Sequence, residues 1–171
     1  MGLLFVTVGS TKFDDLIETV CSEGFQNRAL THGYDSWVVQ FGSSTCRCIG
    51  NIDRSKIELL AFDYNDNIDD YFAIADLIIS HGGTGSILDG IRGPAFLEKR
   101  DSIPKVVVVP NHSLLHDHQS QICEKLHEQG VVDMKTLNRL HEIFNREDSE
   151  YRKLHLCNDS VFKNLFTEFL S

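Results

Sequence analysis

Residues 77–86 read LIISHGGTGS, an apolar run that leads directly into a glycine-rich turn. The run is short, and it contains two β-branched isoleucines, which favours a buried strand. Three glycines follow within four positions, and apolar residues then resume at helical spacing from Ile87. A strand, a glycine turn and a helix in this order are typical of the crossover unit of a parallel α/β sheet.

The same alternation extends along the whole chain. We expect strands at 3–8, 37–41, 57–62, 77–80, 105–109 and 131–132, and helices at 13–20, 68–75, 87–91, 115–129, 137–144 and about 159–170. The polar stretch 43–55 gives no clear prediction, and 92–104 is predicted as a loop. No repeat or linker interrupts the pattern. The sequence therefore predicts an α/β fold with a doubly wound, mostly parallel sheet, and one domain over residues 1–171.

Composition excludes several classes of protein. The chain has 171 residues, with 25 acidic and 16 basic side chains and a net charge of −9, which argues against binding of nucleic acid through its phosphates. Its apolar runs are far shorter than the ~20 residues of a membrane-spanning helix. No signal peptide is readable, and the five cysteines are odd in number and irregularly spaced. We expect a cytoplasmic protein with reduced thiols.

Two loops rich in small residues follow the first and the fourth predicted strands. They read TVGST at 7–11 and SHGGTGS at 80–86. Glycine lets backbone N–H groups approach an anion, and a helix N-terminus adds a partial positive charge. Hydroxyls of Ser10, Thr11, Thr84 and Ser86 can donate to phosphate oxygens. Two such loops facing one cleft suit a diphosphate, although each loop alone is also explained as a tight strand-to-helix turn.

The common nucleotide-binding motifs are absent. Leu88 stands where the last glycine of G-x-G-x-x-G belongs, and there is no G-x-x-x-x-G-K-[ST]. Asp89 lies about one turn into the helix after the second loop. A carboxylate there can accept the ribose hydroxyls of a nucleotide, but it is equally explained as an acid favoured by the helix dipole.

A group of histidines follows the strand predicted at 105–109. His112, His116 and His118 lie close to Asp117 in the sequence, but H-E-x-x-H is missing. We therefore expect no metal site. Hydrogen bonding to a polyhydroxylated ligand, together with Gln119, is the better use of these side chains.

Five segments together resemble one protein family. They are FVTVGST at 5–11, FDDL at 13–16, VQFG at 39–42, ADLIISHGGTGSILD at 75–89 and DHQ at 117–119. In this combination the chain resembles the catalytic subunit of the eukaryotic enzyme that adds the second N-acetylglucosamine to the dolichol-linked oligosaccharide. That subunit is similar to the donor-binding half of the bacterial lipid II-forming glycosyltransferase, which has a GT-B fold. The resemblance runs from about residue 3 to 132 and, more weakly, through the final helix.

The resemblance implies a Rossmann-like domain that binds UDP-N-acetylglucosamine (UDP-GlcNAc), with no cofactor and no metal. The residues that it places in the substrate site are Gly9, Ser10, Thr11, His81, Gly82, Gly83, Thr84, Gly85, Ser86, Asp89, His118 and Gln119. The two glycine loops would cradle the diphosphate, Asp89 would contact the ribose, and His118 and Gln119 would hold the sugar hydroxyls. Phe62 or Tyr64 would flank the uracil.

The reaction implied is an inverting transfer of N-acetylglucosamine to GlcNAc-diphosphodolichol through a β-1,4 linkage. A chain of 171 residues is too short for both halves of a GT-B enzyme. The resemblance implies that a membrane-anchored, acceptor-binding subunit completes a heterodimer at the cytosolic face of the endoplasmic reticulum. We expect the catalytic base on that partner and assign none here. The alternative is a non-catalytic UDP-sugar-binding or regulatory module.

The sequence departs from the family pattern at three places. The loop at 92–104 is longer than the usual link, Asp89 replaces the glutamate of the bacterial relative, and Ser120 stands where glutamine is common. The helix expected at about 159–170 carries an apolar stripe formed by Val161, Phe162, Leu165, Phe166, Phe169 and Leu170. This stripe either contacts the partner subunit or packs on the chain's own sheet.

Overall fold

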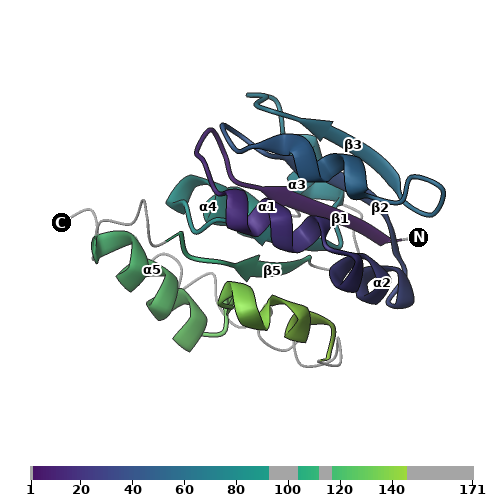
Figure 1. The fold of residues 1–171 in the computed structure, drawn as a ribbon. Coiled ribbons are helices and arrows are strands. Elements are labelled where there is room, and N and C mark those ends of the chain that lie inside the picture. Colours follow the sequence, from purple (N-terminus) through teal and green to yellow (C-terminus); the bar gives the residue numbers. More distant parts are fainter. Residues whose placement is uncertain (1, 93–103, 112–116, 146–171) are drawn as a thin grey trace.

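A six-stranded parallel sheet forms the centre of the molecule (Figure 1). The computed structural model describes residues 2–92, 104–111 and 117–145. The strands are β1 (Gly2–Thr7), β2 (Tyr34–Gln40), β3 (Glu58–Phe62), β4 (Leu77–Ser80), β5 (Lys105–Val108) and β6 (Asp133–Met134). Their order across the sheet is β3-β2-β1-β4-β5-β6, and every neighbouring pair is parallel. The predicted doubly wound α/β fold is confirmed.

Helical segments cover both faces of the sheet. They are α1 (Asp14–Cys21), α2 (Glu23–Thr31), η1 (Cys46–Asn51), α3 (Asp69–Ile74), α4 (Thr84–Arg92), α5 (Asp117–Glu128) and η3 (Leu137–Phe144), of which η1 and η3 are 3₁₀ helices. One face packs under α1, α2, η1 and η3, and the other packs under α3, α4 and α5. The central strands are therefore apolar on both sides, as parallel strands require.

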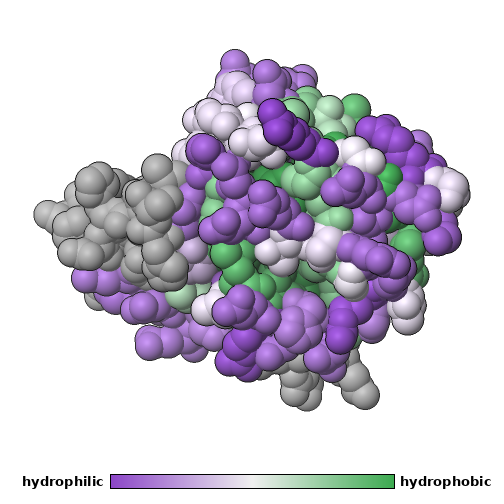
Figure 2. Space-filling view, in the orientation of Figure 1, coloured by the Kyte–Doolittle hydropathy of each residue, from purple (hydrophilic) through white to green (hydrophobic). Residues whose placement is uncertain are grey.

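Alternate residues of β1 show this division directly. Leu4 and Val6 are buried under α1, whereas Phe5 is buried on the opposite face against Phe72 of α3. The Phe5 and Phe72 rings meet edge to face, with centroids 5.0 Å apart. Such period-two alternation fixes the register of a strand between two cores. On the face that Figure 2 shows, hydrophilic residues predominate and hydrophobic ones show between them.

The structure departs from the predicted elements at α2, β6, β2 and α4, of which β2 and α4 each begin three residues earlier than predicted, at Tyr34 and Thr84. The sequence analysis did not predict α2, because this helix buries only Phe25, Gln26 and Ala29 and so has no continuous apolar stripe. The prediction of β6 is wrong by two residues. The Val131 N–H still donates to the Leu126 carbonyl (2.9 Å) as the end of α5 closes, so pairing with β5 begins only at Asp133.

Other predicted segments stand as follows. The helix predicted at 137–144 exists, as the 3₁₀ helix η3, and the stretch 43–55 contains η1. Most of the loop predicted at 92–104 and the whole of the helix predicted at about 159–170 lie outside the described residues. Within the parts of the chain that the structure describes, none of the helices combines the length and the apolarity needed to cross a membrane.

Candidate functional site

The two predicted glycine loops leave adjacent strands at the carboxyl edge of the sheet. β1 and β4 pair in register, with Thr7 opposite Ser80, and the His81 N–H donates to the Thr7 carbonyl (3.2 Å). From β1 the chain continues to β2 on one side, and from β4 it continues to β5 on the other. This is the switch point of a doubly wound sheet, where such folds bind ligands.

The first loop is held mainly by its own hydrogen bonds. The Thr7 hydroxyl donates to Gln40 Oε1 (2.6 Å) and accepts from the Gly9 N–H (3.0 Å). The hydroxyl and the N–H of Thr11 both donate to the Val8 carbonyl, at 2.7 and 3.2 Å. The hydroxyl of Thr11 therefore already has an acceptor other than the expected phosphate. The hydrogen bonds within this loop fix its backbone and leave it few groups that could donate a hydrogen bond to a ligand.

The second loop delivers backbone donors at a helix N-terminus. Gly82 has φ +88°, a conformation that glycine adopts without strain, and it turns the chain from β4 toward α4. The Ile87 N–H donates to the Gly83 carbonyl (3.1 Å). The N–H groups of the first helical turn before it have no intrahelical partner, and they lie at the positive end of the helix dipole. Gly85 in this turn is exposed, and the side chain of Thr84 is outside what the structure describes.

A third loop, after β2, supports the first one, and the sequence analysis did not assign it a role. Ser43 N–H donates to the Thr11 carbonyl (3.0 Å), and the Ser43 hydroxyl donates to the Ser10 carbonyl (2.8 Å). Gly42 has φ +55°, and a Cβ there would lie 2.3 Å from the Thr11 carbonyl oxygen. The only sequence signal for this role was a glycine directly after a strand.

The same third loop contacts the start of α1. The Phe13 N–H donates to the Ser44 hydroxyl (2.8 Å), and the Thr45 N–H donates to Asp14 Oδ1 (2.6 Å). This backbone hydrogen bond and the Lys12 ammonium 3.1 Å away lower the pKa of Asp14 below its ordinary value. The loops after β1 and β2 therefore form one hydrogen-bonded unit.

The side chain of His81, itself a residue of the second glycine loop, lies between Gly9 of the first loop and Gly83. A Cβ on Gly9 would lie 3.2 Å from its Cε1 atom, and a Cβ on Gly83 would lie 2.6 Å from its Nε2 atom. The His81 Nδ1 atom is buried and has no hydrogen-bond partner among the described residues. Burial lowers the pKa of His81, although the Thr7 backbone partly opposes the shift, so the ring is neutral at pH 7.

The segment after β5 approaches the same edge. The side-chain amide of Asn111 donates to the Lys12 carbonyl (3.0 Å), and the Cys123 thiol of α5 lies 3.6 Å from the Gly82 carbonyl oxygen. His118 and Gln119 occupy the first turn of α5, but their side chains are outside the described set, as are His112 and His116. Their contact with the sugar stays a prediction.

Asp89 follows the second glycine loop closely, whereas the uracil candidates lie at the end of β3 and just after it. Asp89 is an exposed residue of α4, one turn beyond the glycine loop as expected. Phe62 ends β3, which β2 separates from β1, and its half-buried ring packs near Tyr71 with centroids 5.9 Å apart. Tyr64 is exposed. The strand β2 therefore lies between Phe62 and the strand that leads into the first glycine loop. The contact of Phe62 or Tyr64 with the uracil stays a prediction.

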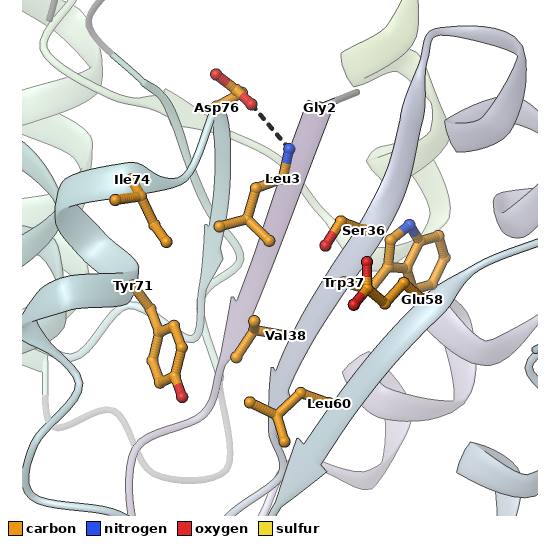
Figure 3. Close-up of a pocket in the computed structure, with 10 residues that line it drawn as sticks. All are labelled: Gly2, Leu3, Ser36, Trp37, Val38, Glu58, Leu60, Tyr71, Ile74 and Asp76. Atoms are coloured by element: carbon orange, nitrogen blue, oxygen red, sulfur yellow. Dashed lines mark hydrogen bonds between the residues drawn. The ribbon is translucent and has the colours of Figure 1, made fainter.

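A groove of about 440 Å³ lies at the opposite, amino-terminal edge of the sheet (Figure 3). Tyr71 and Ile74 of α3 face Leu3, Val38 and Leu60 across it, and Asp76 Oδ2 accepts from the Leu3 N–H (2.8 Å). Because the strands are parallel, this edge is the far side of the sheet from the glycine loops. The groove is a feature separate from the candidate site.

The positions of the side chains that could bind a metal ion also bear on this site. In the described portion of the chain, no group of three or more His, Cys, Asp or Glu side chains is arranged to hold a metal ion. Cys21, Cys46, Cys48 and Cys123 are free thiols. Burial raises the pKa of Cys123 to about 11, so this thiol is protonated and can donate to the Gly82 carbonyl.

Comparison with known families agrees with this geometry. A sequence model of the glycosyltransferase family 28 C-terminal domain matches residues 3–154, and the chain belongs to this family. The fold is similar to the crystal structure of MurG from Acinetobacter baumannii, with a TM-score of 0.58 and 16% identity, over 98% of this chain and 41% of that one. The predicted Rossmann-like half of a GT-B fold is confirmed.

Within this family the chain is similar to proteins named UDP-N-acetylglucosamine transferase subunit ALG13. It is 34% identical to the human protein over 130 residues, which are 76% of this chain and 11% of that protein. It is 33% identical to the Saccharomyces cerevisiae protein over 163 residues, with 75% of each covered. An NMR solution structure of ALG13 aligns with a TM-score of 0.56 and 27% identity, over 80% of this chain and 79% of that one.

These matches confirm the resemblance that the sequence motifs indicated. The chain spans about a tenth of the human and mouse relatives, but 94% of the Kluyveromyces lactis protein, to which it is 27% identical. What the relatives have in common with it is therefore the family 28 domain described here.

Proposed function

We propose that this chain is the donor-binding subunit of a heteromeric inverting glycosyltransferase. It takes N-acetylglucosamine from UDP-GlcNAc and transfers it to GlcNAc-diphosphodolichol in β-1,4 linkage. The observation that carries the proposal is the pairing of β1 with β4, which places the two glycine loops side by side at the switch point of a family 28 domain. The names of the relatives, which specify a UDP-N-acetylglucosamine transferase subunit, support the choice of donor.

The chemistry assigned to this chain is stabilisation of the leaving group. The acceptor hydroxyl attacks the anomeric carbon, the bond from that carbon to the diphosphate oxygen breaks, and UDP departs from the opposite face. Negative charge grows on the diphosphate as the bond breaks. The N–H groups that begin α4 are fixed donors near this position, and fixed donors stabilise developing charge at no cost of reorganisation.

The proton of the acceptor hydroxyl needs a base, and we assign none to the described residues. The His81 ring, whose pKa is lowered by burial, is neutral at pH 7, and we assign Asp89 to the ribose. We place the base on a membrane-anchored, acceptor-binding subunit at the cytosolic face of the endoplasmic reticulum. The word "subunit" in the names of the relatives supports such a partner. The apolar stripe at 161–170 is the proposed contact with it.

Reconstitution tests this division of labour. Membranes that carry a candidate partner should transfer labelled N-acetylglucosamine only when this chain is added, and the chain alone should bind UDP without turnover. Removal of residues 161–171 should leave UDP binding intact but abolish membrane recruitment and transfer. UDP binding without transfer by any reconstituted pair would favour the non-catalytic module, and turnover by the chain alone would overturn the need for a partner.

The contact of Asp89 with the ribose predicts a specific loss of affinity. Asp89→Asn should weaken UDP binding by about 1–3 kcal/mol, the size of a lost charged hydrogen bond. Thermal melting of the variant shows whether the substitution also changes stability. Titration calorimetry with UDP and 2′-deoxy-UDP checks the assignment. Wild type should discriminate between the two ligands more than the variant does, and equal discrimination would remove Asp89 from the ribose.

A further inference from the structure

We propose that His81 is a positioning residue whose imidazole ring sets the separation of the two glycine loops. This inference rests on the proposed function, because the separation matters for holding a diphosphate. A Cβ on Gly9 of the first loop would lie 3.2 Å from this ring, and a Cβ on Gly83 of the second loop would lie 2.6 Å from it, so the ring lies close to both positions. Among the described residues, His81 is the only one whose side chain lies within 4 Å of a Cβ built on Gly9 and also of one built on Gly83.

The contacts of the ring account for the lack of a side chain at Gly83. Gly83 does not have a left-handed φ, so its backbone conformation alone would accept alanine. A Cβ there would lie 2.6 Å from Nε2 and 2.8 Å from Cε1 of His81, distances that real Cβ atoms do not show. The ring therefore occupies the place that a side chain at this position would need.

The environment of the ring suits a rigid spacer. His81 Nδ1 is buried without a described hydrogen-bond partner, and the adjacent backbone is tied to β1 through the His81 N–H and the Thr7 carbonyl. An imidazole has two side-chain torsions and a flat, stiff ring, so packing on both sides leaves it one orientation. Because the interior of a protein is closely packed, a change on one side of such a ring is transmitted to the other.

A double-mutant cycle with UDP as the probe tests this role. Gly83→Ala should weaken UDP binding about tenfold in the wild-type background, since the new methyl group displaces the ring. His81→Ala should weaken it by a similar factor, since the loops lose their spacer. In the His81→Ala background, Gly83→Ala should have an effect of no more than about twofold, because the methyl group then fills vacated space.

Gly85→Ala is the matched control. A Cβ on Gly85 meets no atom within 4 Å, so its effect on UDP affinity should be the same factor with and without His81. Uridine separates positioning from general damage. His81→Ala should reduce affinity for UDP but leave the weaker binding of uridine unchanged, because uridine has no diphosphate. Circular dichroism confirms that each variant is folded.

The possible results distinguish this proposal from the proposed function. An equal effect of Gly83→Ala in both backgrounds, or a parallel loss of uridine binding, would overturn the positioning role while UDP binding stands. Wild-type protein that does not bind UDP would refute the proposed function. The same cycle read in melting temperatures would then test the contact between His81 and Gly83, and additive shifts would refute that contact also.

Discussion

Replacing Gly42 by alanine should destabilise the protein by about 2–5 kcal/mol and abolish UDP binding with it. The residue has φ +55°, a left-handed conformation that costs an alanine about 1–2 kcal/mol. A Cβ would also lie 2.3 Å from the Thr11 carbonyl oxygen and 2.7 Å from that of Gly9. Both obstacles are backbone atoms, so the first glycine loop must move as a unit. Chemical denaturation and UDP titration of the same sample measure the two effects.

Gly33→Ala is the control for the conformational part of this cost. Gly33 also has a positive φ, +82°, but a Cβ there meets no atom within 4 Å. It should lose only about 1–2 kcal/mol and keep its affinity for UDP. If Gly42→Ala were no more destabilising than Gly33→Ala, the close contact between the loops after β1 and β2 would be refuted.

The second large effect should follow from Gly85→Val. A valine at this position should lower UDP affinity at least thirtyfold, about 2 kcal/mol, because its side chain covers the N–H groups that begin α4. The fold should remain intact, since a Cβ there meets nothing within 4 Å and valine is a better helix residue than glycine. Calorimetry with UDP and thermal melting separate the two properties.

Gly24→Val provides a matched substitution away from the site. Gly24 is the second residue of α2, as Gly85 is of α4, and a Cβ there also meets nothing within 4 Å. The two variants should melt at similar temperatures, but only Gly85→Val should lose UDP. Full UDP affinity in a folded Gly85→Val protein would remove the start of α4 from the binding site.

Local sequence patterns predicted most of the sheet and the place of the second glycine loop. β4, Gly82 and α4 follow each other within 16 residues, from Leu77 to Arg92, so short-range periodicity and turn chemistry were enough to identify them. The adjacency of β1 and β4 follows from the topology of doubly wound sheets. Family resemblance then supplied the roles of individual residues, which the pattern alone left open.

The parts that the sequence did not predict depend on contacts between distant residues. Gly42 lies against the carbonyl oxygen of Thr11, which is 31 residues earlier in the sequence. Gln40 accepts a hydrogen bond from Thr7, which is 33 residues earlier. Nothing in either local sequence indicates such a partner. Likewise, α2 forms because Phe25 packs edge to face on Trp37 of β2, with centroids 6.0 Å apart, and not because its own sequence has helical periodicity.

Backbone N–H shifts of isotope-labelled protein during titration with UDP test the central claim most directly. The account predicts that the largest shift changes fall on the second glycine loop, at Gly82, Gly83, Gly85 and Ser86. Smaller shift changes should fall on Gly9 and Ser10 of the first loop. The groove at the amino-terminal edge offers an internal comparison, because it lies on the far side of the sheet. Shift changes confined to its residues Leu3, Ser36 and Leu60, with none at the glycine loops, would contradict the account.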